Sequence, residues 1–383
     1  MMKRKVRMGM VGGGQDAFIG TVHRMAAALD GEIELVCGAF SSSESKSKAS
    51  GAALYLSPDR VYVSFEEMIN KERALPKDVR MDFVSIVTPN YLHAKPAILA
   101  LENGFHVLCE KPLSLSSSEA EALRDKVKHS GLLFGLMHNY TGYPMVKEAR
   151  SIVNSGRIGP VRKVIAEYMQ GWLAARIEES GQKQADWRTD PDKAGISCCV
   201  GDIGTHAENL AEYITGLKIS ELSADVSTFV KGRKLDDDAS VLLRFENGAK
   251  GVLFSSQIAI GEENELKIRI YGEMGSLEWL QSEPNSLLVK MNGAPVQVYR
   301  TGVDKSYLSK AALRETRLPG GHPEGYIESL ANIYREFSRA IQGSQEGRKD
   351  EFDFPDIEDG VRGMRFIEAV IESGRKNAQW VKL

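Results

Sequence analysis

Several features that would place a chain in a specialised class are scarce in this sequence. It has only 4 cysteines among 383 residues, and none of them are in CxxC spacing. Its 49 Lys and Arg nearly balance its 52 Asp and Glu, so no basic field for binding nucleic acid is expected. No apolar run approaches the roughly 20 residues that span a bilayer. Nucleic acid and membrane are therefore not expected as partners.

The cysteines and the start of the chain both favour a cytoplasmic protein. Cys37 and Cys109 lie inside apolar, strand-like runs, where a thiol behaves as a small hydrophobic group. A reducing compartment suits such cysteines. The basic start has no apolar run and no small-residue cleavage site behind it, so we expect no export signal.

The length predicts two domains. In the first third, short apolar runs alternate with stretches of helical spacing, which is typical of a doubly wound parallel sheet covered on both faces. The strands are expected at residues 6–11, 33–39, 83–87, 105–108 and 132–137. The helices are expected around residues 22–29, 66–69, 94–102 and 117–128. We assign residues 1–138 to this dinucleotide-binding α/β domain.

The pattern of predicted strands and helices changes after about residue 138. A strand at 161–169 and a helix at about 202–214 precede five strands with few helices between them, and two helices close the chain. Asn247-Gly248 predicts a hairpin with a type I′ turn. Residues 139–383 are therefore expected to form an α+β domain with an open, mostly antiparallel sheet.

Glycines join the first strand to the first helix. Gly12, Gly14 and Ala17 fit the relaxed G-x-G-x-x-A pattern, and Phe18 and Ile19 open the helix. Such a turn lets the backbone approach a pyrophosphate at a helix N-terminus. Gly20 resembles the glycine that packs helix against strand, displaced by a small insertion. The plainer alternative is a tight connection without a ligand.

The second strand lacks the acidic residue that would bind an adenosine ribose. It is followed instead by hydroxyls and lysines, among them Ser41 and Lys46. These groups suit a 2′-phosphate, so NADP is preferred over NAD. The alternative is that Ser41 only caps the next helix.

Polar motifs follow two more strands and open a later helix. Thr88, Pro89, Asn90 and His93 come after one strand, and Glu110-Lys111-Pro112 follows the next. Both lie at carboxyl ends of strands, where open α/β sheets bind ligands. Asp202 and His206, four residues apart, share one face of a predicted helix.

With these motifs in this order, the chain resembles the Gfo/Idh/MocA family, which groups glucose–fructose oxidoreductase, inositol dehydrogenases and rhizopine-catabolism proteins. The resemblance covers nearly the whole chain. It implies that His206 is the base for a substrate hydroxyl, that Asp202 orients its ring, and that Lys111 binds the reacting oxygen. It also places Thr88, Asn90 and His93 near the nicotinamide ribose.

Each of these residues also has a structural alternative. Asp202 could be only the N-cap of its helix. Lys111 could be a solvated lysine at a strand end, and His206 could be an interior histidine with its hydrogen bonds satisfied. His206-Ala207-Glu208 has the H-x-E shape of zinc deaminases, but no Pro-Cys-x-x-Cys follows, so no metal is expected.

Further candidates lie around these motifs. Pro89 and Glu110 are added to the cofactor site. Trp187 and Arg188 lie in a polar loop and are predicted to close over cofactor or polyol. Asn139, Tyr140 and His322 are substrate candidates. The Asp236-Asp237-Asp238 run is expected to be a solvated turn.

The sequence therefore predicts an NAD(P)-dependent dehydrogenase or reductase for a ring secondary alcohol of a sugar, glycoside or cyclitol. Three alternatives remain. The first is a glycosidase that uses transient oxidation by bound NAD, the second is a dinucleotide-binding sensor or co-repressor without turnover, and the last is a structural partner role. The open sheet predicts a homo-dimer or homo-tetramer.

Overall fold

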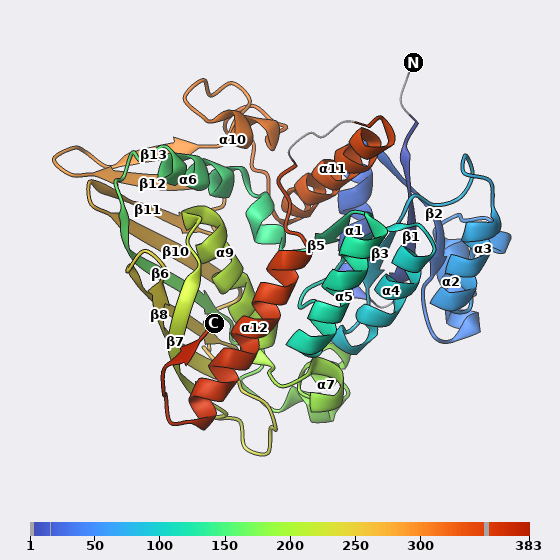
Figure 1. Ribbon diagram of the computed structural model, residues 1–383, viewed down its shortest axis with the longest axis horizontal. Coiled ribbons are helices and arrows are strands. Elements are labelled where there is room, and N and C mark those ends of the chain that lie inside the picture. Colours follow the sequence, from blue (N-terminus) through green and yellow to red (C-terminus); the bar gives the residue numbers. More distant parts are fainter. Residues whose placement is uncertain (1–3, 16, 348–351) are drawn as a thin grey trace. The chain divides into compact units, whose positions relative to one another are not determined.

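The computed structural model describes residues 4–15, 17–347 and 352–383 (Figure 1). The chain divides into two compact units. The first comprises residues 1–139 and 326–361, and the second comprises residues 140–325 and 362–383. No helix in the described part of the chain is both long enough and apolar enough to cross a membrane.

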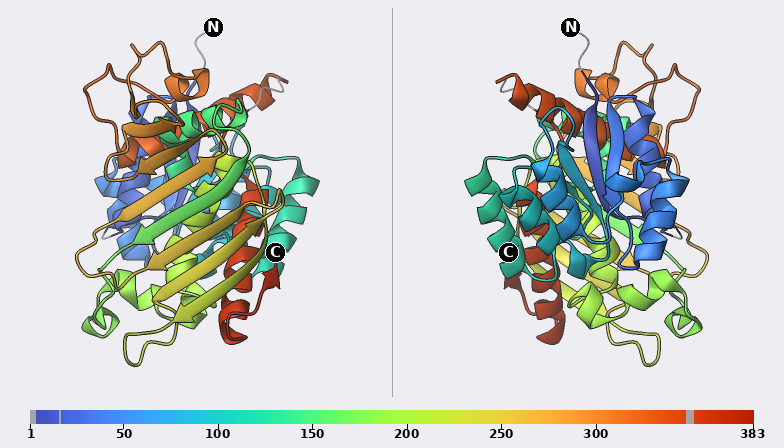
Figure 2. Two further views of the ribbon diagram at one scale, coloured as in Figure 1. Left: turned by 90° about the vertical axis from the view of Figure 1, so that its left-hand side faces the viewer. Right: turned by 90° about the vertical axis from the view of Figure 1, so that its right-hand side faces the viewer.

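The first unit is built on a five-stranded parallel sheet, as predicted (Figure 2, right). Its order is β2-β1-β3-β4-β5, with strands β1 (Val6–Gly12), β2 (Ile33–Ala39), β3 (Phe83–Val87), β4 (His106–Cys109) and β5 (Phe134–Leu136). Strands β1, β3, β4 and β5 are buried along nearly their whole length, so both faces are covered there, whereas the edge strand β2 is exposed or half-buried at residues 34–36. The chain winds outward from β1 in one direction and from β3 in the other, so the switch point lies between these two strands.

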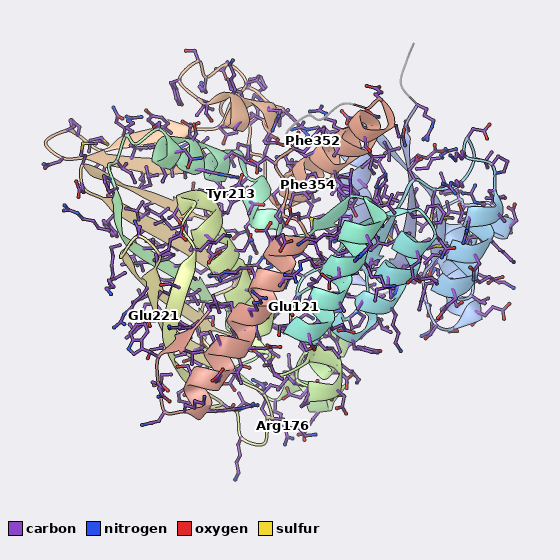
Figure 3. The ribbon with its side chains drawn as sticks, in the orientation of Figure 1. Glu121, Arg176, Tyr213, Glu221, Phe352 and Phe354 are labelled. Carbon is purple, nitrogen blue, oxygen red and sulfur yellow. The ribbon has the colours of Figure 1, made fainter. Side chains whose placement is uncertain are left out.

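Helices cover both faces of this sheet. They are α1 (Phe18–Leu29), α2 (Glu44–Ala53), α3 (Phe65–Ala74), α4 (Ala94–Glu102), α5 (Ser117–Ser130) and α11 (Tyr326–Gln345). Helix α1 packs against α11, and α4 packs against α5. With this strand order, the right-handed crossovers usual for parallel strands put these two pairs on opposite faces. Helix α11 packs along α1, so residues from late in the chain complete this core. The ring of Phe354, labelled in Figure 3, lies nearly perpendicular to that of Phe337 in α11, with 5.3 Å between the ring centroids.

The second unit contains a nine-stranded sheet (Figure 2, left). Its order is β13-β12-β11-β10-β6-β9-β8-β7-β14. Every neighbouring pair is antiparallel except β6 and β9, which confirms the predicted class. The strands are β6 (Val161–Met169), β7 (Ile219–Ser227), β8 (Asp238–Phe245), β9 (Lys250–Ser256), β10 (Glu265–Gly272), β11 (Gly275–Leu280), β12 (Ser286–Met291), β13 (Gln297–Arg300) and β14 (Val381–Lys382).

The helices of this unit lie on one face of that sheet. Helix α9 (Thr205–Thr215) packs on β6, β9 and β10, and α6 (Pro144–Asn154) packs on β11 and β12. Short helices α7 (Lys183–Arg188), α8 (Pro191–Ala194) and α10 (Lys310–Arg314) lie in the connections. Helix α12 (Ile357–Arg375) contributes residues to both units.

The β8–β9 hairpin forms where Asn247-Gly248 predicts it, but the turn type differs. Gly248 has φ +87°, whereas Asn247 is not among the residues with positive φ. The Gly248 N–H bonds to the carbonyl of Phe245, and the Phe245 N–H bonds to the carbonyl of Ala249. The connection is therefore a turn closed by one left-handed glycine, and the predicted type I′ turn is wrong.

Candidate active site

The glycine-rich turn lies at the switch point of the first sheet. Gly12 and Gly13 have φ of +82° and +70°, a conformation that side chains rarely adopt. A Cβ on Gly20 would lie 2.2 Å from the Cα of Gly13, so α1 packs directly against the turn. A Cβ on Gly12 would meet Thr88 at 2.8 Å. The turn therefore adjoins the end of β3, and Gly20 has the close-packing role that its sequence position predicts.

The start of α1 fits the diphosphate of a dinucleotide. A Cβ on Gly14 would lie 2.8 Å from the carbonyl oxygen of Phe40, so only glycine fits there. Ala17 is the N-cap and offers no capping side chain, and Phe18 is 67% exposed. A bare N-terminus behind a glycine cradle suits an anion. Ile19 follows on the same turn of helix, and Asp16 lies outside the described residues.

The end of β2 carries the residues predicted for a 2′-phosphate. Ser41 Oγ accepts a hydrogen bond from the Ser43 N–H at 3.2 Å. The N-cap of the following helix is Ser43, so the alternative that Ser41 caps it is wrong. Lys48 pairs with Glu44 at 2.6 Å. Lys46 lies on the exposed part of α2.

His93 is buried at the carboxyl edge of the sheet. Its Nδ1 lies 2.8 Å from the carbonyl oxygen of Pro112, and its Nε2 lies 2.8 Å from that of Thr88. Burial lowers the pKa of His93, because the charged ring would be desolvated. The ring therefore joins the loop after β3 to the loop after β4. Its predicted place beside a nicotinamide ribose stays a prediction, as do those of Thr88, Pro89 and the buried Asn90.

Glu110 and Lys111 follow β4. Glu110 is buried, with Oε1 2.6 Å from Nε2 of His23 and Oε2 accepting from the Lys111 N–H at 3.1 Å. Burial alone would raise the pKa of Glu110, but the His23 hydrogen bond and nearby positive charges outweigh it and lower the pKa. The peptide bond between Lys111 and Pro112 is cis.

His138 is a candidate site residue that the sequence analysis did not single out. It follows β5 and is buried, and burial together with the charge of Lys111 lowers its pKa to about 3. A neutral imidazole thus lies near Lys111. Its position directly after a sheet strand was the available signal. Asn139 is also buried and donates to Ser329 Oγ at 3.5 Å, within the same unit.

Asp202 and His206 belong to the second unit. Asp202 lies in a π-helical turn (Val200–Gly204), and His206 lies in the first turn of α9. Gly204 is the N-cap of α9, so the alternative of Asp202 as N-cap is wrong. Single π turns in helices often occur at functional sites. The ring of the buried His206 lies nearly perpendicular to that of Tyr140, with 4.8 Å between the ring centroids.

Tyr140 belongs to a hydrogen-bonded group beneath His206. Its hydroxyl lies 2.5 Å from that of Tyr168, which donates to Asn264 Oδ1 at 2.7 Å. Asn264 Nδ2 returns a hydrogen bond to Tyr140 at 3.2 Å. This closed ring of three hydrogen-bonded side chains fixes the position of Tyr140, whose ring contacts His206.

Asp236 and Asp237, which precede β8, are buried, so the prediction of this acidic run as a solvated turn is wrong. Asp236 accepts hydrogen bonds from the N–H groups of Cys198 and Val200, both at 2.8 Å. Asp237 accepts from the Phe229 N–H at 2.8 Å and pairs with Arg233. These carboxylates bind backbone groups that the π turn and a neighbouring loop would otherwise leave unpaired. Asp236 thereby anchors the segment that leads into Asp202.

Three further predicted residues are Trp187, Arg188 and His322, and the structure places Trp187 and Arg188 in helix α7 instead of the predicted polar loop. Arg188 ends α7 and donates from Nε to Asp202 Oδ2 at 3.0 Å, with its guanidinium 4.1 Å from the ring of Trp187. The structure thus brings Arg188, Trp187 and Asp202 together. His322 is exposed before α11, with Nδ1 3.2 Å from the Pro319 carbonyl oxygen. Lys111 belongs to the first unit, while Asp202 and His206 belong to the second.

Comparison with known proteins places the chain in a family. Residues 6–138 match the model of an oxidoreductase family with an NAD-binding Rossmann fold. Residues 146–278 match that of the Gfo/Idh/MocA C-terminal domain. The chain belongs to the Gfo/Idh/MocA family of NAD-binding oxidoreductases, which confirms the resemblance seen in the sequence.

Relatives of similar length match along most or all of the chain. An uncharacterised oxidoreductase of Bacillus subtilis, YfiI, is 34% identical over 100% of this chain and 98% of its own. Levoglucosan dehydrogenase of Pseudarthrobacter phenanthrenivorans is 29% identical over 83% of this chain and 84% of its own. An inositol dehydrogenase homologue from Azotobacter vinelandii, solved with NAD+, has a TM-score of 0.94 at 36% identity, covering 99% of this chain and 98% of its own. An inositol dehydrogenase homologue from the same organism, solved with NADH and myo-inositol, has a TM-score of 0.92 at 34% identity, covering 99% of this chain and 98% of its own.

Proposed function

We propose that this protein is an NAD(P)-dependent dehydrogenase that oxidises a secondary alcohol on the ring of a sugar, glycoside or cyclitol, or reduces the corresponding ketone. The observation that carries the proposal is the Asp202–His206 pair. A carboxylate held by two side chains precedes a buried imidazole by one helical turn. Such a pair suits the removal of a hydroxyl proton near neutral pH.

Each residue has a separate chemical task. A nicotinamide dinucleotide, when bound, supplies the hydride acceptor. His206 takes the proton of the substrate hydroxyl. Asp202 orients the His206 ring and stabilises its charged form. Lys111 donates a hydrogen bond to the reacting oxygen and favours the alkoxide as charge develops there.

The dinucleotide is held by backbone and by a few side chains in this proposal. The glycine turn and the start of α1 bind its diphosphate, with Gly12, Gly14, Ala17, Phe18 and Ile19 in contact. Thr88, Asn90 and Glu110 lie at the neighbouring strand ends, toward its nicotinamide half. The cradle that only glycine fits supports this placement.

The proposed dinucleotide preference is NADP over NAD. No carboxylate ends β2, and Ser41 and Lys46 offer donors for a 2′-phosphate. The test is the ratio of kcat/KM for NADP+ and NAD+, measured for the wild type and for Lys46→Glu. We expect the substitution to lower the ratio about tenfold, since one phosphate contact is lost and a repulsion is gained. A wild type that strongly favours NAD+, as the complexes of its relatives would allow, contradicts this preference.

The substrate class is supported by the relatives whose names include inositol and levoglucosan. The experiment is a panel of sugars, glycosides and inositols, each incubated with NAD+ or NADP+ while formation of the reduced nicotinamide is followed. Turnover of at least one ring alcohol is expected. Dinucleotide binding without turnover of any panel member would contradict an enzymatic function and favour a sensor. Release of a free sugar from an aryl glycoside without net reduction would favour a glycosidase.

The protein is also proposed to form a homo-dimer or homo-tetramer. No helix among the described residues of the second unit covers the far face of its sheet (Figure 2, left). Leu242 and Val298 on that sheet are each 51% exposed. Light scattering is expected to give twice or four times the 42.2 kDa chain mass, and Leu242→Glu is expected to lower it. A monomer at micromolar concentration contradicts this.

A further inference from the structure

Two side chains from different elements bind one oxygen of Asp202. Arg188 Nε, at the end of α7, lies 3.0 Å from Oδ2, and Gln257 Nε2, directly after β9, lies 2.9 Å from the same atom. The side chains of Asp202 and Arg188 are only 13% and 20% exposed. The carboxylate that precedes His206 therefore has a guanidinium and an amide as fixed neighbours.

Gln257 is held in the orientation that this contact needs. It is fully buried, and the Cys198 thiol donates to its Oε1 at 3.4 Å. Burial keeps the pKa of Cys198 well above its usual range, so the sulfur carries its proton and acts as the donor. The amide oxygen thus faces Cys198, and the amide NH2 faces Asp202.

Arg188 is held on two further sides. Its guanidinium lies 4.1 Å from the centre of the Trp187 ring, within the range of a cation–π contact. Its Nη1 donates to Gln184 Oε1 at 2.7 Å and to the Gln184 carbonyl at 3.2 Å. Together these contacts orient Nε of Arg188 toward Asp202.

We propose that Arg188, fixed by Trp187 and Gln184, is a positioning residue that acts on the reaction through Asp202. The inference rests on the proposed dehydrogenase function. A guanidinium in a charge-assisted hydrogen bond keeps the neighbouring carboxylate ionised and fixes its rotamer. An ionised, fixed Asp202 is what the charged form of His206 requires. This role differs from the cofactor or substrate contact that the sequence predicts for Arg188.

The same unit contains a matched control. Arg244 on β8 donates from Nη1 to Glu221 at 2.6 Å, and its guanidinium lies 3.8 Å from the ring of Trp380. Glu221 is labelled on β7 in Figure 3. Arginine, tryptophan and carboxylate thus recur on β8, near the C-terminus and on β7, which are other elements than those that carry Arg188, Trp187 and Asp202. Arg244→Met removes the same chemistry without touching the proposed site.

The first experiment separates a positioning role from a binding role. For Arg188→Met we expect kcat to fall tenfold or more, with KM for the alcohol and Kd for NADH unchanged within twofold. Added guanidinium ion should restore part of the kcat of Arg188→Met. No such recovery is expected if the substitution lowers kcat only by disturbing the fold. Arg244→Met should behave as the wild type. A raised Kd for NADH with kcat intact would overturn the proposal and restore the cofactor contact.

The second experiment tests whether Arg188 acts through Asp202. In Asp202→Asn protein, adding Arg188→Met should lower kcat less than twofold, because the carboxylate on which Arg188 acts is gone. If Arg188→Met lowers kcat by the same factor in the Asp202→Asn protein as in the wild type, the proposal is overturned. Gln257→Leu gives a second, independent test if Arg188→Met does not fold. It should also lower kcat with Kd for NADH unchanged, and an unchanged kcat would count against the proposal.

A third readout does not depend on activity. If the wild type oxidises no panel alcohol, the proposed function fails, and the coupling is then measured by urea unfolding. The midpoint shift of Arg188→Met with Asp202→Asn should be smaller than the sum of the single shifts. Additive shifts would show that Arg188 does not act on Asp202, whatever the function.

Discussion

Nε2 of His23 lies 2.6 Å from Oε1 of Glu110, although 87 positions separate the two residues in the chain. Nδ1 of the same ring lies 2.7 Å from the Tyr334 hydroxyl, which also meets Ser85 Oγ at 2.7 Å. These groups are buried. They join α1, which begins behind the glycine turn, to the strand end that carries Lys111 and to α11.

The first prediction concerns this buried pair. His23→Leu leaves the Glu110 carboxylate without its nearest donor, and an unpaired buried charge is costly. We expect the free energy of unfolding to fall by about 3 kcal/mol. Urea unfolding followed by circular dichroism measures it.

The control removes the charge as well as its partner. In the double variant His23→Leu with Glu110→Gln, the neutral amide needs no counter-charge. Part of the lost stability should therefore return relative to His23→Leu alone. If the free energy of unfolding of the double variant falls by the sum of the two single-variant losses, then His23 does not act by compensating the charge of Glu110.

The second prediction concerns the close packing of Gly20 on Gly13. In Gly20→Ala the new Cβ would lie 2.2 Å from a backbone atom, so α1 must move away from the turn. We expect Kd for NADH to rise at least tenfold and stability to fall by about 1–3 kcal/mol. Met25→Ala, at a half-exposed position of the same helix, is the control. Unchanged NADH affinity in calorimetric titration of Gly20→Ala would contradict the placement of the diphosphate.

Most of the first sheet was predictable because its strands are apolar on both faces. Helix α2 was missed for a physical reason. It buries Ser47, Ser50 and Gly51 instead of an apolar stripe, so its sequence resembles a polar loop. Ser47 Oγ accepts from the Phe40 N–H and donates to the Tyr62 carbonyl. Helical spacing of apolar residues does not detect a helix that docks through hydroxyls and small residues.

The sequence also did not predict that α11 belongs to the first unit. Its apolar face is plain in the sequence, but nothing local says that it packs on α1, more than three hundred residues earlier. The assignment of domains to 1–138 and 139–383 followed the chain alone. The compact units instead return residues 326–361 to the first unit, because α11 completes the core beside α1.

The candidate site likewise has residues that the sequence predicted and residues that it did not. Motifs with short spacing, such as Glu110-Lys111 and Asp202–His206, were visible. The partners of Asp202 were not, since Arg188 and Gln257 lie 14 and 55 residues away and meet it only through the fold. The buried Asp236 was misjudged because a run of three acidic residues is usually solvated. Here backbone N–H groups compensate its burial.

The third prediction concerns pH. Burial lowers the pKa of His106 to about 4 from an ordinary 6.5, and Nδ1 accepts from the Leu133 N–H at 3.0 Å. The unfolded chain therefore takes up this proton first as pH falls. The stabilisation is fully present above pH 6.5 and is lost as pH falls toward about 4. We expect His106 to contribute about 2 kcal/mol to this loss.

His106→Asn isolates that contribution. The Asn oxygen can accept the Leu133 N–H bond, but it does not titrate. The variant should lose less stability than the wild type between pH 7 and pH 4 in urea unfolding, although His93 and His138 keep a dependence of the same sign. Identical pH slopes for the two proteins would contradict the assignment to His106.

The most direct test of the account is turnover by His206→Asn with the best alcohol of the panel. Lys111→Met is measured beside it, and NADH binding serves as the control for folding. If His206 takes the hydroxyl proton, kcat falls about a hundredfold or more while Kd for NADH stays within twofold of the wild type. A His206→Asn protein that binds NADH normally and turns over at the wild-type rate would contradict it.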